Sequence, residues 1–188
     1  MFFYGFYQKI ETSRGLWQRS RDHRMYRVMS MNKKNWKNLV FWVLVSEAVG
    51  LAAGLLTGNS AEMYGQLAVK PPLAPPGWLF PVVWTVLYAL MGIGAGLVAS
   101  ELPGRDRNRG LNLMVAQLIV NFFWPLLFFN AGAYILALVW LLLLLVLVVW
   151  MTLEFRKVSP LAALLQIPYI LWLLFATYLN AAVWYLNR

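Results

Sequence analysis

Five long apolar blocks alternate with polar segments along the chain. Each block has about 20 residues or more, and at ~1.5 Å per residue a helix of that length crosses a hydrocarbon core of ~30 Å. The blocks are continuous and are not divided into the short periodic patches of a soluble core. The pattern therefore predicts an all-α membrane protein. Its expected spans are residues 38–57, 78–100, 111–130, 133–153 and 161–186.

Most connectors between these blocks are short. Residues 101–110 form a charged turn, residues 130–133 a tight hairpin, and residues 154–160 a basic segment that ends in a proline; only the first connector, residues 58–77, is long. Short connectors force neighbouring helices to run antiparallel. We therefore expect an up-down five-helix bundle.

Basic residues gather on one side of this bundle. If the N-terminus is cytoplasmic, the cytoplasmic segments carry fourteen Lys or Arg, and the other side carries only Lys70 and Arg188. The positive-inside rule then predicts an N-in, C-out orientation. The composition, 61% hydrophobic and 12% charged, agrees with a helical membrane protein.

Residues 1–37 form a basic tail with nine Lys or Arg against Glu11 and Asp22. It contains no apolar segment of signal-peptide length, so we expect no cleaved secretion signal. Two interpretations are open. In the first, the tail is a disordered arm attracted to anionic lipid or nucleic acid. In the second, part of residues 1–30 lies before the native start of the protein, since methionines precede the segment MNKKNWKNLV, which would itself make a normal short cytoplasmic start. We favour the second and expect no nucleic-acid partner.

The composition also narrows the possible chemistry. The chain has no cysteine, and its one histidine, His23, lies in the tail. Disulfides and thiolate or histidine-cluster metal sites are therefore excluded, and we predict no metal site and no required cofactor. We find no paired nucleophile and base, phosphate loop or carboxylate cluster, so hydrolysis, phosphoryl transfer and ion-coupled pumping lack candidate residues.

Glu47 is an acidic residue in the middle of the first predicted span. A carboxyl at that depth is expected to face the bundle interior. It either forms a hydrogen bond between helices, with a partner such as Gln117 or Asn121, or contacts a polar ligand.

Glycines recur at helix-packing spacing, at Gly50, Gly54 and Gly58 in the first span and at Gly92 and Gly96 in the second. Close contact between helices explains this spacing. We favour contact within one protomer over contact across a dimer.

Prolines in three spans stand beside tryptophans that are too deep for an interfacial belt. A proline can bend a helix, and bent helices leave room between them. Core packing or lipid contact would account for these tryptophans. A cavity walled by indoles and a few polar groups would instead suit a flat, hydrophobic, partly polar ligand. The prolines are Pro81, Pro125 and Pro168, the tryptophans Trp84, Trp124 and Trp172, and the polar neighbours Gln117, Asn121 and Asn180.

Three segments resemble one known family. They are KPPLAPPGWLFPVVWTVLYALMG at residues 70–92, NFFWPLLFF at residues 121–129 and PYILWLLFATYLNAAVWYLN at residues 168–187. They are similar to the signature, the third helix and the fifth helix of the TspO/MBR family, the translocator and tryptophan-rich sensory proteins, also called the peripheral-type benzodiazepine receptor family. The resemblance covers about residues 38–188. It implies a five-helix transmembrane bundle whose pocket opens toward the loop between helices one and two, which acts as a lid.

The resemblance also implies ligands and site residues. Family members bind tetrapyrroles such as protoporphyrin IX and haem, and many bind cholesterol. Trp84 and Trp172 match the porphyrin-handling tryptophans, Asn121 and Trp124 match pocket residues of helix three, and Ala176 and Leu179 match ligand or sterol contacts of helix five. With Tyr88, Gln117 and Asn180 these form the candidate ligand-binding set, and the candidate lid residues are Lys70, Pro71, Pro75 and Pro76.

Several positions depart from the family pattern. Leu73 replaces a usual tryptophan, Met63 precedes Tyr64 where Trp-Tyr is common, and Leu136 and Trp140 stand where many relatives carry a tryptophan and an acid. Helix three also lacks the glycine motif linked to dimerisation in some members. Ligand preference and any homodimer geometry are therefore left open.

Three functions are open. The leading one is a membrane receptor, sensor or carrier for tetrapyrroles, with the ring stacked on Trp84, Trp124 and Trp172 and its carboxylates near Lys70. The second is light- and oxygen-dependent degradation of protoporphyrin IX, with Trp84 and Trp172 as candidate electron partners. The third is a structural or partner-binding membrane protein. We expect a multi-pass protein of a bacterial cytoplasmic membrane, or of the mitochondrial outer membrane if the chain is eukaryotic.

Overall fold

The computed structural model describes residues 35–58 and 71–187. In this part of the chain five helices are long and apolar enough to cross a membrane, and no strand occurs. The predicted all-α, five-helix membrane fold is therefore confirmed. The helices are Asn35–Thr57, α3 (Leu79–Ser100), α4 (Arg105–Pro125) continued by the π-helix η1 (Leu126–Asn130), α5 (Tyr134–Val158), and the pair α6 (Pro160–Leu164) and α7 (Ile167–Leu186).

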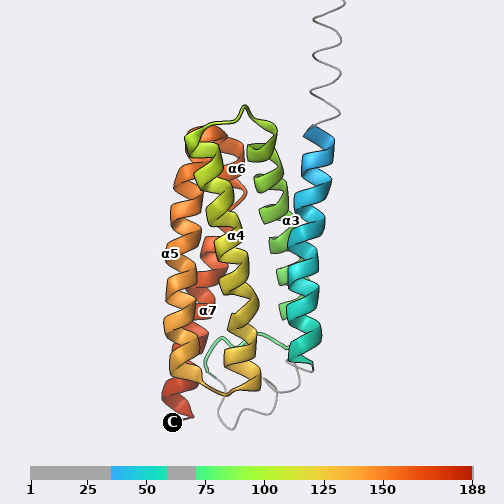
Figure 1. Ribbon diagram of the computed structural model, residues 1–188. Coiled ribbons are helices and arrows are strands. Elements are labelled where there is room, and N and C mark those ends of the chain that lie inside the picture. The colour runs from blue at the N-terminus through green and yellow to red at the C-terminus, as the bar shows by residue number, and fades with distance from the viewer. Residues whose placement is uncertain (1–34, 59–70, 188) are drawn as a thin grey trace, which may run out of the picture. The chain divides into compact units, whose positions relative to one another are not determined.

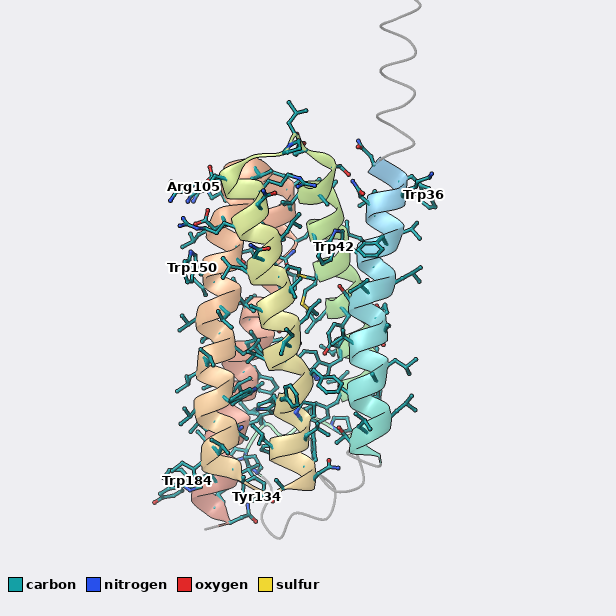
Figure 2. All side chains as sticks on the ribbon, viewed as in Figure 1. Trp36, Trp42, Arg105, Tyr134, Trp150 and Trp184 are labelled. Atoms are coloured by element: carbon teal, nitrogen blue, oxygen red, sulfur yellow. The ribbon has the colours of Figure 1, made fainter. Side chains whose placement is uncertain are left out.

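The described residues from Asn38 onward form one compact unit in which successive helices run up and down. Figure 1 shows the turn at residues 101–104 and α6 at one end, which we call the basic end. The segment 71–78, the hairpin after η1 and the C-terminus lie at the other end, which we call the loop end. In Figure 2 Arg105 marks the basic end, and Tyr134 and Trp184 mark the loop end. The predictions for residues 1–30, Lys70 and Met63 lie outside the described residues.

Two helices extend by five residues or more beyond the spans predicted from hydropathy. Helix α4 begins at Arg105 and not at residue 111, and α5 ends at Val158 and not at residue 153. Charged side chains occupy both extensions, and at the end of α5 the Lys157 ammonium lies 2.8 Å from the Glu154 carboxylate. Hydropathy reports the part of a helix that suits the hydrocarbon core, whereas a helix can continue into the polar interface.

The three span prolines act in different ways. Pro81 lies in the first turn of α3 and Pro168 at the start of α7, where an N–H has no intrahelical partner in any case. Pro81 therefore has no reason to bend α3, whereas Pro168 directly follows the interruption between α6 and α7 that divides the fifth predicted span. Pro125 ends α4, and the chain continues as the π-helix η1, where the Ala131 amide donates to the Leu126 carbonyl at 2.9 Å.

Glycines bring the first long helix directly against α3. A Cβ atom at Gly92 would lie 2.5 Å from the Cα of Val43, and one at Gly96 would lie 2.6 Å from the Cα of Leu39. Backbone atoms cannot move aside as a side chain can, so both positions require glycine. The contact lies within one protomer, as the sequence analysis favoured. Gly54, in contrast, has no atom within 4 Å of such a Cβ.

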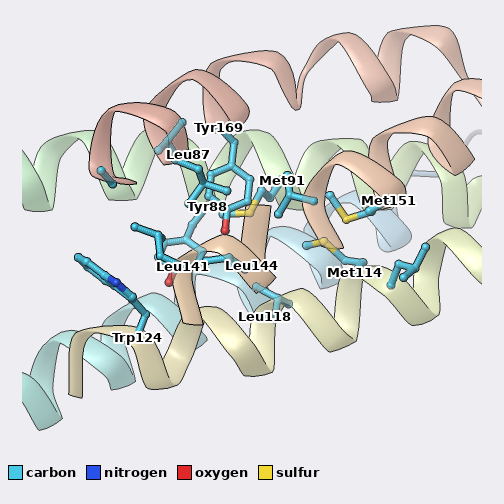
Figure 3. Packing of buried hydrophobic residues seen from close by; sticks show 14 of the residues in the cluster. Leu87, Tyr88, Met91, Met114, Leu118, Trp124, Leu141, Leu144, Met151 and Tyr169 are labelled. Atoms are coloured by element: carbon cyan, nitrogen blue, oxygen red, sulfur yellow. The ribbon is translucent and has the colours of Figure 1, made fainter. Parts of the chain in front are cut away.

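The core runs along the centre of the bundle. Figure 3 shows side chains from α3, α4, α5 and α7 meeting there, and α4 packs most extensively against α5. The core contains three methionines, whose flexible thioethers fill irregular space. Its labelled members are Leu87, Tyr88, Met91, Met114, Leu118, Trp124, Leu141, Leu144, Met151 and Tyr169.

Candidate functional site

A buried hydrogen-bonded chain joins α4 to α7. The Asn121 amide donates to the Tyr169 hydroxyl at 3.0 Å, and that hydroxyl donates to Oε1 of Gln117 at 3.2 Å. The Gln117 amide nitrogen faces the sulfur of Met114 at 3.3 Å. All three polar side chains are almost fully buried. A satisfied buried network of this kind fixes the register between helices.

A second polar contact lies nearer the loop end. With its amide oriented to satisfy both neighbours, Asn180 donates to the Tyr134 carbonyl at 2.9 Å and accepts from the Trp124 indole N–H at 3.3 Å. The Trp124 ring also stacks on Phe128, with centroids 5.3 Å apart. Asn180 therefore ties α7 to both α4 and α5.

Two of the candidate tryptophans are only partly buried, and both contact other rings. Trp84 lies 5.7 Å from Tyr88 and 6.2 Å from Tyr169, centroid to centroid. Trp172 contacts Phe80 edge to face at 6.1 Å, and its indole N–H is buried without a hydrogen-bond partner in the described structure. A buried N–H without a partner is an unused donor in the middle of an aromatic cluster.

A small cavity lies beside Trp124 and Asn180. Its volume is about 20 Å³, enough for roughly one water molecule, whereas pockets for drug-sized ligands have ~300–1,000 Å³. Aromatic side chains fill the space that a larger pocket would need. The cavity is lined by Phe80, Trp124, Phe128, Phe129, Ala176, Leu179 and Asn180.

The candidate residues thus fall into two groups. Trp124, Ala176, Leu179 and Asn180 line the cavity. The other five, Trp84, Tyr88, Gln117, Asn121 and Trp172, do not line it and belong to the polar chain and the ring contacts next to it.

The described part of the predicted lid is attached to the bundle. Pro71 is buried, and the Tyr178 hydroxyl of α7 donates to the Pro72 carbonyl at 2.9 Å. Pro75 is partly buried and Pro76 is exposed. Leu73 is 80% exposed and has a positive φ of 63°. Among the other departures, Leu136 is exposed, and Trp140 donates to the Val120 carbonyl at 2.7 Å, which joins α5 to α4.

Glu47 lies on the first long helix and is partly exposed. Gln117 and Asn121, its suggested partners, are bonded to Tyr169. One turn further along the same helix, Gly50 lies against the ring of Tyr88.

Sequence reasoning missed Tyr169, which lies at the centre of the polar chain. A signal was present, because Tyr169, Trp172, Ala176 and Asn180 recur at helical spacing and share one face of α7. Phe128 was also missed. A signal was present here too, because Phe128 lies seven residues after Asn121 and four after Trp124, which is helical spacing, and its ring stacks on Trp124.

Comparisons with known proteins agree with this arrangement. The TspO/MBR family matches residues 42–186. The chain belongs to the TspO/MBR family. It is 38% identical over 141 residues to the tryptophan-rich protein TspO of Chlorobaculum tepidum, covering 74% of this chain and 89% of that protein. It is 37% identical over 156 residues to the translocator protein of Ovis aries, covering 81% and 92% of the two chains.

The human translocator protein is 44% identical over 129 residues, covering 68% of this chain and 76% of that protein. Bacterial and animal members of the TspO/MBR family are thus both similar to this chain. Membership supports a role as an integral, multi-pass membrane receptor or sensor.

Proposed function

We propose that this protein binds a tetrapyrrole, such as protoporphyrin IX or haem, between α3, α4 and α7 at the loop end of the bundle. The supporting observation is that Trp124, Ala176, Leu179 and Asn180, selected from the sequence, converge on one aromatic-walled cavity. Flat aromatic ligands stack on indole and phenyl faces. The Asn180 amide lies in the cavity wall. The indole N–H of Trp172, whose ring contacts the wall residue Phe80, is a donor without a partner in the described structure and would orient the ligand once the cavity widens.

Binding requires the cavity to widen, because about 20 Å³ is far too small for a porphyrin. Pockets of this kind exist as minor conformations that a ligand stabilises. Phe80 and Phe129 are the partly buried residues among those that line the cavity, so we expect their side chains to move when it widens. The hydrogen bond from Tyr178 to Pro72 holds the described end of the lid over α7.

Titration with protoporphyrin IX tests the proposal. Tryptophan fluorescence should be quenched saturably at micromolar ligand, with free tryptophan amide as the optical control. Ala176→Leu fills the cavity and should weaken binding at least tenfold, the effect of about 1.4 kcal/mol. Ala181→Leu, on the lipid-facing side of α7 with the exposed Leu174 and Tyr185, is the matched control. Unsaturable quenching, or equal affinity for both variants, would reject the site and favour a structural or partner-binding role.

Light-dependent degradation of the bound porphyrin is the second candidate function. It is favoured by the run of ring contacts from Tyr88 through Trp84 to Tyr169, at 5.7 and 6.2 Å, because neighbouring aromatic rings can pass an electron to an excited ligand. Spectra of illuminated and dark samples in air separate binding from degradation. Retained binding with full photobleaching in a Trp84→Phe, Trp172→Phe double variant would exclude the role of these tryptophans.

A further inference from the structure

A groove separate from the site above runs between the first long helix and α4. Its volume is about 330 Å³, and every residue that lines it is apolar. Val115, Ile119 and Phe123 are exposed, so the groove opens outward to the surrounding bilayer. The lining residues are Val45, Val49, Val115, Leu118, Ile119, Phe122 and Phe123.

The groove follows from how the first long helix is held. Gly92 and Gly96 draw that helix onto the backbone of α3. Only 11% of its most apolar stretch is buried, compared with 39% for Arg105–Asn130. The helix is therefore close to α3 while its side toward α4 stays open. In a membrane this apolar space must be filled by an acyl chain or by another protein.

Within residues 35–58 and 71–187 no acidic side chain pairs with Arg107, which lies where this side of the bundle reaches its basic end. Nη2 of Arg107 donates to the Ala99 carbonyl at 2.9 Å, and the Asn38 amide donates to the same carbonyl at 3.1 Å. The guanidinium thus lies where the first long helix, α3 and α4 meet. Its Nη1 donates to the neutral Asn108 side chain at 3.0 Å, and its Nε is buried without a partner.

Glu154, the acid that pairs with two neighbouring cations, does not pair with Arg107. In the described part of the chain, the ion pairs join Glu154 to Arg109 at 3.5 Å and to Lys157 at 2.8 Å. A partly buried guanidinium that donates only to neutral oxygens is a favourable site for a phosphate, which accepts charge-assisted hydrogen bonds.

Helical register connects the cation to the groove. Arg107, Leu111, Met114 and Leu118 recur at three- and four-residue spacing and therefore share one face of α4, and Leu118 lines the groove. Val115 lies eight residues beyond Arg107, which is ~12 Å along a helix. A phospholipid covers such a distance with its glycerol backbone and the first methylene groups of an acyl chain.

We propose that the groove binds one anionic phospholipid, with its phosphate on Arg107 and an acyl chain between the first long helix and α4. Charge favours this occupant over a second copy of the chain, since an apolar partner helix would leave Arg107 without a counter-charge. The predicted N-in orientation places the site in the cytoplasmic leaflet, which is the anionic one. The lipid site does not depend on tetrapyrrole binding.

Native mass spectrometry of the full-length protein in detergent tests the site. The protein is incubated with equal amounts of dioleoyl phosphatidylglycerol and dioleoyl phosphatidylcholine, and the retained lipids are counted. Phosphatidylglycerol should be preferred. Arg107→Gln should lower its retention about tenfold, the order expected for losing a charge-assisted hydrogen bond. Val115→Phe, which fills the groove but keeps the cation, should lower retention of both lipids.

Matched variants distinguish loss of the lipid site from a general loss of positive charge and from misfolding. Arg105→Gln removes the same charge from the same helix, but Figure 2 shows Arg105 at the edge of the bundle away from the first long helix, so lipid retention should not change. Val139→Phe on the exposed side of α5 is the control for Val115→Phe. Arg107→Lys keeps the charge and should restore most of the preference. A role of Arg107 only in bonding the Ala99 carbonyl near the end of α3 would not predict this lipid preference.

Several results would overturn the proposal. One is equal retention of the two lipids by the unchanged protein, and another is equal loss of phosphatidylglycerol in Arg105→Gln and Arg107→Gln. A third is a Val115→Phe variant that becomes monomeric from a dimer but still retains its lipid. In that case the groove would be the contact surface for a second copy of the chain.

Discussion

Leu73 occupies a backbone conformation that a leucine rarely adopts. It has a φ of 63° in the turn closed by the Ala74 amide and the Pro71 carbonyl at 3.2 Å. Left-handed backbone costs about 1 kcal/mol for a residue with a Cβ, and glycine is free of that cost. Leu73→Gly should therefore raise the thermal midpoint in detergent by a few degrees, roughly the effect of 1 kcal/mol. Leu73→Ala keeps the strained backbone, so its thermal midpoint should not rise. An equal rise of the midpoint in both variants would show that the gain comes from removing the exposed leucine side chain.

Tyr169 is the residue on which the buried polar chain depends. Tyr169→Phe leaves the Asn121 amide and Oε1 of Gln117 without their shared partner, and a buried unsatisfied group costs about 1–3 kcal/mol. The free energy of unfolding should fall by that amount. Tyr178→Phe removes an exposed hydroxyl bonded to Pro72 and should cost less than about 1 kcal/mol. If chemical denaturation gives equal losses for the two variants, the network does not stabilise the bundle.

At the scale of the helices, the pair formed by the first long helix and α3 is the most sensitive to small changes. Gly92→Ala places a methyl group 2.5 Å from a backbone atom of Val43, and overpacking of this kind costs about 1–3 kcal/mol. Gly54→Ala, where a Cβ meets nothing within 4 Å, should be neutral or stabilising because alanine favours a helix. Thermal unfolding of both variants in one detergent gives the comparison. Equal midpoints would contradict the close contact.

Sequence patterns predicted the helices well and their interruptions poorly. Continuous hydropathy is sufficient to identify a membrane helix, because all backbone groups in the bilayer must be paired internally. The consequences of a proline depend on its distance from the helix start. Pro81 lies in the first turn of α3, as the expected span from residue 78 places it, whereas Pro125 precedes a π-helix whose start no pattern marked.

At the scale of the whole molecule, the candidate site was only partly predictable. Helical spacing and resemblance selected Trp124, Ala176, Leu179 and Asn180, which the structure brings together at one cavity. The volume of that cavity was not predictable, because it depends on the side chains of Phe80, Phe128 and Phe129 that fill it. The outward groove was not predictable either, since it arises from the approach of the first long helix to α3.

The orientation of the whole bundle can be tested directly because the chain contains no cysteine. Leu102 is 86% exposed in the turn at the basic end, and Leu73 is 80% exposed at the loop end. Fourteen basic residues against two predict that the basic end is cytoplasmic. In intact bacterial cells a membrane-impermeant maleimide should therefore label Leu73→Cys and leave Leu102→Cys unlabelled until the cells are opened. The reverse pattern would invert the topology and would move the proposed phospholipid site to the opposite leaflet.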